Sequence, residues 1–316
     1  MDGTTEQAPE EGTFTPATGD PVSGDPATAA FVAHRDLLFT VAYEMLGSAA
    51  DAEDVLQETW LRWSAVGLDQ VRDRRAYLVR ITTRQALNRL RTVRRRREAY
   101  VGPWLPEPLL TSPDVAEDVE LAESVSMAMM LVLETLAPTE RAVFVLREVF
   151  AVEYDEIAAT VGKSPAAVRQ IAHRARARVR ARRPRVAVGA REARAVADSF
   201  RRALEDRDTE AFLALLAPGV TLIGDGGGIR RAAVRPIVGA GQVARFYLGG
   251  GLRTEARVTC EPASVNGGPA LAVLLDGALD SVMALRVEEG LVTGLYVVRN
   301  PEKLTRVTTP TPLTLR

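Results

Sequence analysis

Arginine side chains gather in two stretches of this chain, at a density suited to binding a polyanion. Residues 72–97 hold eleven arginines against one acid, Asp73, and residues 163–185 hold nine basic residues and no acid. Together they carry half of the 40 lysines and arginines, although the net charge is only −1. Basic groups that neutralise phosphates release counterions and so drive binding. The pattern favours nucleic acid as a partner, and solvated arginine-rich helix faces are the alternative.

The second basic stretch contains a helix-turn-helix pattern. Residues 154–161 have apolar positions at helical spacing, Gly162 supplies a turn, and Ser164-Pro165 is typical of a helix start. In the helix that follows, apolar side chains share one face and polar side chains turn outward. Arginine can read guanine and glutamine can read adenine in the major groove. A basic amphipathic helix in an unrelated bundle is the alternative.

A row of acids precedes the first basic stretch. Asp51, Asp54, Gln57 and Glu58 share one side of a predicted helix. Carboxylates and an amide at this spacing are suited to a basic protein surface and not to DNA. A solvated acidic helix is the alternative. The basic helix that follows could track a nucleic-acid backbone, whereas the nearby aromatic residues are more typical of a core.

The hydrophobic pattern divides the chain into three folded parts and a linker. Apolar residues recur every three to four positions in the first two parts, which predicts helices, and β-branched runs broken by glycines mark the third. Pro103, Pro106 and Pro108, followed by a run of acids, interrupt the pattern between the first two parts. We predict a disordered tail over residues 1–27, a helical unit over 28–98, a linker over 99–123, a helical unit over 124–184 and an α+β unit over 185–316.

The third part combines helices with a curved sheet. Two helices are expected over residues 190–207 and 209–216, with a strand over 220–223 and a short helix over 240–248. Glycine-containing turns then separate a series of extended segments, which favours a curved antiparallel sheet. The expected strands cover residues 256–265, 270–275, 281–288 and 291–298.

Several kinds of chemistry are not expected. Cys260 is the only cysteine, and His34 and His173 are the only histidines, so neither a disulfide framework nor a Cys/His zinc site can be assembled. We therefore predict no metal and no cofactor. No apolar run approaches the roughly 18 residues of a membrane helix, and the first residues lack a secretory pattern. The prediction is a cytoplasmic protein with no membrane partner.

Catalysis has one candidate group. Asp225 precedes three glycines and could act as a general base. We find no base and oxyanion partner set to accompany it, and a carboxylate that caps a glycine turn fits turn chemistry better. No catalytic residue is assigned, and the prediction is that the protein is not an enzyme.

The ordered motifs of residues 28–184 resemble those of extracytoplasmic-function sigma factors of the sigma-70 family. Residues 51–63 are similar to the region-two helix that grips the polymerase clamp, and residues 75–91 to the promoter-melting segment that reads the minus-ten element. Residues 136–141 and the helix-turn-helix resemble region four, which reads the minus-thirty-five element. Asn88 stands where the family has an aspartate.

This resemblance implies two all-α sigma domains and two partners, core RNA polymerase and promoter DNA. The residues implied to bind polymerase are Asp51, Asp54, Gln57 and Glu58. Those implied to contact minus-ten DNA are Arg80, Arg84, Asn88 and Arg91. Those implied to contact minus-thirty-five DNA are Arg169, Gln170, His173, Arg174 and Arg176.

The third part resembles the SnoaL-like family, in which a cone-shaped sheet wraps a pocket. The segments 104–109, 225–228 and 300–304 are similar to motifs of the sigma-J-type subgroup, in which this extension is attached to the sigma domains. The resemblance implies regulation in cis and leaves room for an unknown small ligand in the pocket. The implied regulatory residues are Trp104, Leu105, Pro106, Asp225, Gly226, Asn300 and Pro301.

The linker itself suggests how such regulation could work. Its prolines stiffen it, while Trp104, Leu105, Leu109 and Leu110 give it an apolar surface that water disfavours. We predict that the C-terminal domain covers this strip and so regulates a sigma factor. A helix-turn-helix regulator that senses a ligand without core polymerase, and a SnoaL-like enzyme, are the alternatives.

Overall fold

The computed structural model describes residues 25–182, 188–249, 256–307 and 309–315. Most of the tail predicted over residues 1–27 therefore lies outside the described residues. Within the described part, no helix is both long and apolar enough to cross a membrane.

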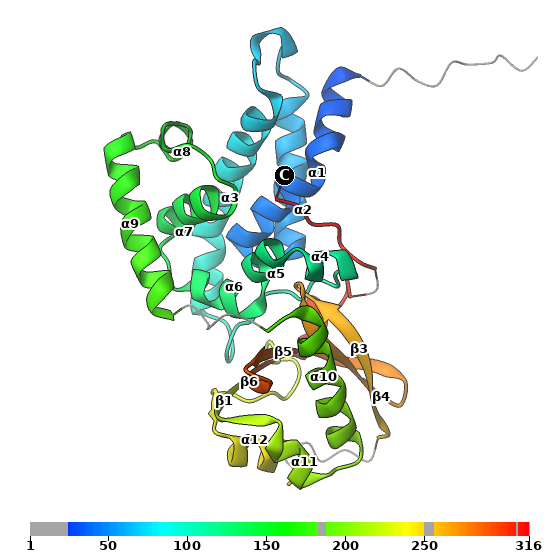
Figure 1. Ribbon diagram of the computed structural model, residues 1–316. Coiled ribbons are helices and arrows are strands. Elements are labelled where there is room, and N and C mark those ends of the chain that lie inside the picture. Colours follow the sequence, from blue (N-terminus) through cyan, green and yellow to red (C-terminus); the bar gives the residue numbers. More distant parts are fainter. Residues whose placement is uncertain (1–24, 183–187, 250–255, 308, 316) are drawn as a thin grey trace, which may run out of the picture.

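Three long helices form the N-terminal unit (Figure 1). They are α1 (Pro26–Leu46), α2 (Ala49–Trp63) and α3 (Arg74–Glu98), with a short 3-10 turn at Leu68–Gln70. The α1 helix begins where the Asp25 side chain accepts the Ala27 and Thr28 amides, and it ends at Gly47 in the left-handed conformation. Ser48 then caps α2 by accepting the Asp51 amide. The tight connection packs α1 against α2.

The second helical unit contains the predicted helix-turn-helix. Its recognition pair is α8 (Tyr154–Val161) and α9 (Pro165–Arg182), separated by Gly162 at a φ of +69°. Ser164 Oγ accepts the Ala167 amide at 3.3 Å, which confirms the predicted helix start. The preceding elements are α4 (Pro113–Glu117), α5 (Val119–Val125), α6 (Met127–Glu134), α7 (Pro138–Phe144) and a π-helical turn (Val145–Val149).

The two helical units share one hydrophobic core. Buried side chains from α1, α2 and α3 are continuous with those from α5 to α9. The α3 helix touches both α7 and α8. Leu313, near the C-terminus, joins the same core, and the amide of Thr314 donates to Thr40 Oγ1 of α1 at 3.2 Å. The end of the chain thus returns to its first helix.

The C-terminal unit is a six-stranded sheet with helices. Its helices are α10 (Ala190–Glu205), α11 (Thr209–Ala214) and α12 (Ala240–Tyr247), followed by a 3-10 turn (Pro301–Lys303). Its strands are β1 (Leu216–Asp225), β2 (Ile237–Val238), β3 (Val258–Val265), β4 (Gly268–Leu275), β5 (Ala278–Glu288) and β6 (Leu291–Val298).

The sheet has the order β2-β1-β6-β5-β4-β3. The expected antiparallel pairing is found in four of the five strand pairs, and the exception is β1 and β6, which are parallel neighbours. The strands from β3 to β6 are joined by tight hairpins, which require antiparallel pairing, whereas β1 and β6 are far apart in sequence and carry no such restriction.

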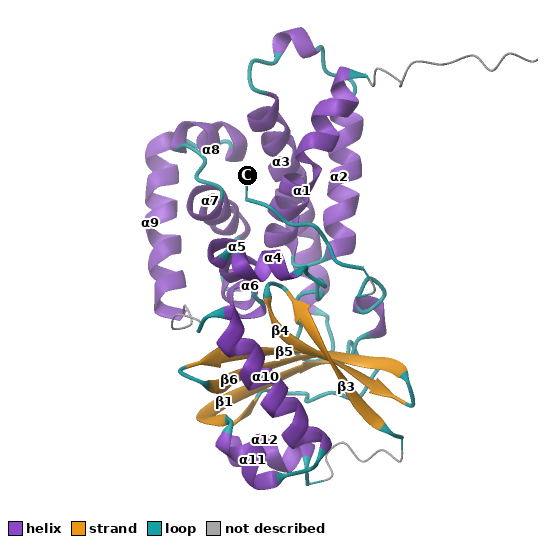
Figure 2. Ribbon diagram, turned by 45° about the vertical axis from the view of Figure 1, so that its right-hand side comes forward, coloured by secondary structure: helices purple, strands orange, loops and turns teal. Residues whose placement is uncertain are grey.

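Each face of the sheet is covered by a different part of the chain (Figure 2). One face packs on α10, α11 and α12 around Phe200, Phe212 and Leu295. The other face packs on the linker and on α6, through Leu105 and Met127. The sheet therefore joins its own domain to the two helical units.

Candidate interface between the linker and the C-terminal domain

The linker lies between the helical units and the sheet. Leu105 is 0% exposed and Leu109 is 2% exposed, so the predicted apolar strip is covered. Trp104 is half-buried between two cations, with Arg97 Cζ 3.6 Å and Lys303 Nζ 4.3 Å from its ring centroid. Cations favour the faces of aromatic rings, and more so when they are shielded from water.

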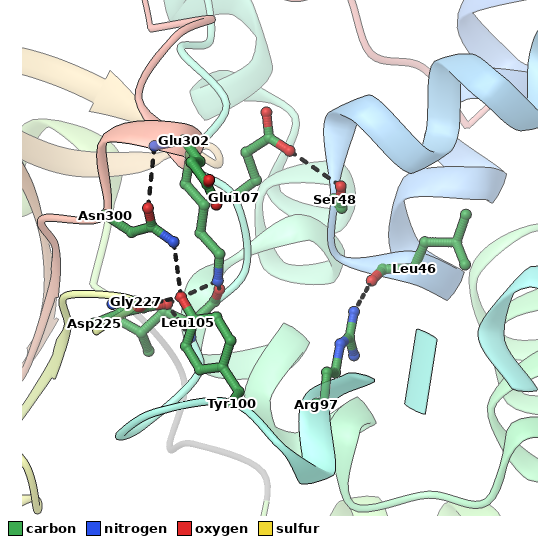
Figure 3. A network of polar contacts seen from close by, with 11 residues as sticks. Leu46, Ser48, Arg97, Tyr100, Leu105, Glu107, Asp225, Gly227, Asn300 and Glu302 are labelled. Atoms are coloured by element: carbon green, nitrogen blue, oxygen red, sulfur yellow. Dashed lines mark hydrogen bonds and ion pairs between the residues drawn. The ribbon is translucent and has the colours of Figure 1, made fainter. Parts of the chain in front are cut away.

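Asp225 is the centre of the polar contacts at this interface (Figure 3). Its Oδ1 accepts the Tyr100 hydroxyl at 2.6 Å and the Gly227 amide at 3.0 Å. Its Oδ2 accepts the Leu105 amide at 2.8 Å and Lys303 Nζ at 2.7 Å. A carboxylate has about four lone-pair sites, and here each has a donor. We refer to Asp225, Tyr100, Asn300 and Lys303 as the Asp225 cluster.

Asn300 completes this cluster. Its Nδ2 donates to the Tyr100 hydroxyl at 2.9 Å, and its Oδ1 accepts the Glu302 amide at 3.0 Å. Gly227 lies directly against it, since a Cβ there would be 2.3 Å from Asn300 Nδ2. Lys303 also donates to the Leu105 carbonyl at 2.5 Å. The cluster thus holds both the side chains and the backbone of the linker.

The parallel pairing of β1 and β6 explains why two distant motifs meet. Asp225 ends β1 opposite Val298 at the end of β6. Parallel strands finish at the same edge of a sheet, so the glycines after Asp225 and the turn at Asn300 emerge side by side. The Asp225 carbonyl then accepts the amides of Arg299 and Asn300 at 2.7 and 3.1 Å.

Burial changes the acid-base properties of the cluster. The pKa of Lys303 is lowered, because the loss of water outweighs the attraction of Asp225. Burial also raises the pKa of Tyr100, and its hydrogen bond to Asp225 raises it further. Tyr100 therefore stays a donor at neutral pH, as its contact with Asp225 requires.

Glu107 connects the linker to the N-terminal unit. Its Oε2 accepts the Ala49 amide at 2.8 Å and the Ser48 hydroxyl at 3.2 Å, at the beginning of α2. The Tyr43 hydroxyl donates to the Glu107 carbonyl at 2.8 Å. A carboxylate at the N-terminus of a helix also interacts favourably with the helix dipole. Linker and α2 are thereby fixed to each other.

The residues predicted to bind polymerase lie on one exposed side of α2. Asp54, Gln57 and Glu58 are exposed, and Asp51 is partly buried. Arg89 of α3 donates to Asp51 Oδ1 at 2.8 Å and to Asp54 Oδ2 at 2.5 Å. Glu58 Oε2 accepts Gln85 Nε2 of α3 at 3.0 Å, so three of the four residues already have a partner within the chain.

The residues predicted to contact minus-ten DNA lie along α3. Arg84 donates to the carbonyls of Ala159 and Thr160, near the end of α8, at 2.6 and 3.2 Å. The other three are Arg80, stacked on the Tyr77 ring at 4.6 Å, and the exposed pair Asn88 and Arg91.

Between α3 and α8 lies a groove of about 740 Å³. One wall carries Arg75 and Arg80 of α3 and Arg72 just before it, and the opposite wall carries Glu153, Asp155 and Glu156. The first part of α3, the helix predicted to contact minus-ten DNA, thus faces acids of the second helical unit.

The residues predicted to contact minus-thirty-five DNA are on α9. Arg169, Gln170, His173 and Arg174 are exposed, whereas Arg176 is turned toward its own unit, where it bonds Glu148 and Tyr154 at 2.8 and 2.5 Å. This set forms a surface separate from the minus-ten set.

The predicted site residues do not include Tyr43, Tyr100, Glu107 and Lys303, which make the contacts of Asp225 and α2 with the linker, although Glu107 and Lys303 lie within the segments 104–109 and 300–304 indicated by the resemblance. Lys303 carried a signal, since it is one of two lysines among 40 basic residues. Tyr43 had none, because an aromatic residue at an apolar position of α1 is indistinguishable from a core residue.

Comparison with known proteins places these features in a family. Residues 30–96 match the model described as sigma-70 region 2, and residues 126–179 match sigma-70, region 4. The extracytoplasmic-function (ECF) RNA polymerase sigma factor SigJ of Mycobacterium tuberculosis is 38% identical over 288 residues, which are 87% of this chain and 92% of the relative. The probable ECF sigma factor SigI of M. tuberculosis is 33% identical over 89% of this chain and 95% of its own length. The crystal structure of M. tuberculosis SigJ matches with a TM-score of 0.72 at 36% identity, over 91% of this chain and all of that one.

Proposed function

Because this chain belongs to the ECF RNA polymerase sigma factors, we propose that its SnoaL-like domain regulates transcription initiation in cis by docking the linker. The chain is a sigma factor with a region 2 unit and a region 4 unit, and such units imply binding to core polymerase and promoter DNA. We propose the division of the chain at the boundaries predicted above, and action in the cytoplasm, where polymerase works.

The observation that carries this proposal is the sharing of Asp225. The carboxylate accepts two donors from the linker, Tyr100 and Leu105, and one from the C-terminal segment, Lys303. Asp225 is 0% exposed. Undocking the linker would remove two of the four donors of this buried carboxylate, the Tyr100 hydroxyl and the Leu105 amide, which is unfavourable unless water replaces them. The docked linker is therefore the favoured state of the free protein.

Docking also restrains the two sigma units. Glu107 fixes the linker to the beginning of α2, and Arg84 of α3 is held by the carbonyls of α8. We infer that this closed arrangement limits promoter engagement, because the minus-ten helix faces region four instead of DNA. Release of the linker would allow the two units to separate and reach their two promoter elements.

We propose that core polymerase binds through Asp51, Asp54, Gln57 and Glu58. Asp54 is half-exposed and paired with Arg89, so a basic polymerase surface could compete for it. Replacing Asp54 or Glu58 by Arg is expected to weaken core binding in a pull-down titration, with helical content unchanged. Unaltered core affinity in both variants would contradict this assignment.

We propose that region four reads the minus-thirty-five element through Arg169, Gln170, His173 and Arg174. Arg169→Ala and Arg174→Ala are each expected to lose about 1–3 kcal/mol wherever the side chain reads a base. Arg176, already bonded to Glu148, is expected to contribute less. An equal loss on all DNA sequences would assign these arginines to phosphates.

For region two we propose minus-ten contacts by Arg80, Arg84, Asn88 and Arg91. For the C-terminal domain we propose a regulatory and not a catalytic role, because the four donors around Asp225 leave it no lone pair to act as a base. A small ligand in this domain remains a prediction.

The test compares two carboxylates of the same sheet in the full chain. Asp225→Asn removes the charge that binds Lys303 and the linker, while the control Asp280→Asn removes the partner of Arg299 away from the linker. Asp225→Asn should speed hydrogen exchange at Trp104–Leu110 by at least roughly tenfold and raise core-dependent transcription. The control should do neither. Unchanged exchange and transcription in Asp225→Asn would refute regulation in cis.

A further inference from the structure

The turn between β3 and β4 enters the seam where all three units meet. It consists of Asn266 and Gly267, at φ values of +53° and +70°. Asn266 is 1% exposed, although hairpin turns normally lie in water. The neighbouring linker pairs with the end of β3, since Leu110 forms a bridge with Val265 and the Thr111 amide donates to the Ser264 carbonyl at 2.9 Å.

The Asn266 amide binds three segments at once. Its Nδ2 donates to the Tyr43 hydroxyl of α1 at 2.7 Å and to the Val125 carbonyl of α5 at 2.8 Å. Its Oδ1 accepts the Leu109 amide of the linker at 3.0 Å. Both donor hydrogens are used. Region two, the linker and α5, which leads directly into region four at residue 126, thus depend on one side chain.

The turn itself does not require this position. The β4–β5 turn, Asp276-Gly277, has nearly the same backbone, with φ values of +50° and +82°. A Cβ on Gly277 would have no described atom within 4 Å, whereas a Cβ on Gly267 would lie 2.6 Å from Ala122 Cα. Turn chemistry explains an asparagine followed by glycine, but not its burial against region four. The contacts must have another role.

We propose that Asn266 is the positioning residue that holds region four against region two. A buried amide that loses its hydrogen-bond partners is destabilised. Separation of α5 from α1 would break the bonds of Asn266 to Tyr43 and Val125, and water cannot replace them as long as the turn stays buried. The inference rests on regulation in cis and gives it a second contact. The two contacts are distinct, because Asn266 touches α1 and α5 directly, whereas the Asp225 cluster holds the other end of the linker.

Asn266→Asp tests the proposal with almost no change in shape. Asp tolerates a positive φ, but its carboxylate has no hydrogens for Val125, and the Tyr43 hydroxyl already donates to Glu107. We would place spin labels on cysteines at the exposed positions Arg62 and Arg180 of the full chain and measure their distance distribution. Cys260, the only natural cysteine, is buried.

The expected result is a longer, broader distribution in Asn266→Asp, with an open fraction on the order of tenfold higher. Hydrogen exchange at Leu109 should accelerate, while exchange at Leu105 stays as in the parent chain. Parent-like distances together with parent-like protection of Leu109 would overturn the proposal.

A second pair keeps the test decisive if Asn266→Asp does not fold. Gly267→Ala and Gly277→Ala impose the same backbone strain, but only the former also collides with Ala122. Gly267→Ala should open the seam and Gly277→Ala should not, and equal distances in the two would overturn the proposal. If the seam opens and core-dependent transcription is unchanged, the positioning role stands and regulation in cis fails.

Discussion

The two faces of the sheet bury similar side chains against different parts of the chain. On one face, Phe200 of α10 and Phe212 of α11 pack with ring centroids 4.9 Å apart, and both are fully buried. On the other face, Leu105 of the linker and Met127 of α6 cover Val298. The first set belongs to the domain itself. The second set belongs to segments that move, in our proposal, when the two sigma units separate.

This difference separates stability from regulation. Loss of packing on the α10 face should unfold the domain, because α10, α11 and α12 form the domain's own core with that face. Loss of packing on the linker face should release the linker and leave the sheet folded. The polar contacts are divided in the same way. Asp225 bonds the linker at Leu105 and Asn266 bonds α1 at Tyr43, and both bonds lie on the side of the sheet that faces the linker.

The largest expected effect is on the α10 face. Phe200→Ala removes a fully buried ring and should lower the free energy of unfolding by about 3–5 kcal/mol. Urea unfolding of the full chain, followed by hydrogen exchange in β5 and β6, measures it. If Phe200→Ala instead accelerated hydrogen exchange in the linker and left β5 and β6 protected, the two faces would not differ in the way described.

Leu105→Ala should have the next largest effect. The side chain is 0% exposed, so its loss should weaken linker docking by about 2–4 kcal/mol. Hydrogen exchange should increase over the linker but not in β5 or β6. Val101→Ala is the control, because this side chain is 64% exposed and should change docking by less than about 0.5 kcal/mol. Equal effects of the two would contradict a docked linker.

A pH dependence should come from Glu44 of α1, a buried carboxyl where α1 meets the second helical unit. Burial raises the pKa of Glu44 in α1 to about 8, and Ser124 of α5 and Arg141 of α7 lower it less. Separation of region four would expose Glu44 and return its pKa toward its ordinary value, so the closed state holds a proton that the open state releases. Raising the pH from about 5 to 8 should therefore weaken closure by on the order of a hundredfold.

Label distances at the two pH values measure this effect. Glu44→Gln should remove the dependence, whereas Glu53→Gln, at a partly exposed position paired with Arg35, should keep it. A dependence that survives Glu44→Gln would assign it to another group.

The smallest expected effect is that of Arg84. Its bonds to the end of α8 are partly exposed, so Arg84→Ala should weaken closure by less than about 1 kcal/mol. Arg91→Ala, on the same helix and bonded only within α3 to Asn88, should leave closure unchanged. The distance between the spin labels measures both variants. An opening by Arg84→Ala as large as that by Leu105→Ala would contradict this prediction.

The fold could be predicted from local patterns. Amphipathic spacing, the Ser164-Pro165 start and the glycine turns depend on neighbours in sequence, and the helical units and the α+β unit predicted from them are confirmed. The parallel pairing of β1 with β6 was missed, because it joins residues about 70 positions apart and has no local signal.

The site was predicted only in part, for the same reason. The family motifs indicated Asp225, Asn300 and the linker, and these do meet. Tyr43 and Asn266 were missed because they have ordinary local roles, an aromatic core position and a hairpin turn, and their bond joins residues 223 positions apart.

The apolar seam also gives closure a temperature dependence. Leu105, Leu109 and Met127 leave water when the linker and α6 settle on the helical core and the sheet. Burial of apolar surface lowers the heat capacity, and the resulting attraction weakens on cooling. Linker docking should therefore show a negative heat capacity change in calorimetry, and a chilled sample should contain more of the open form than one at room temperature.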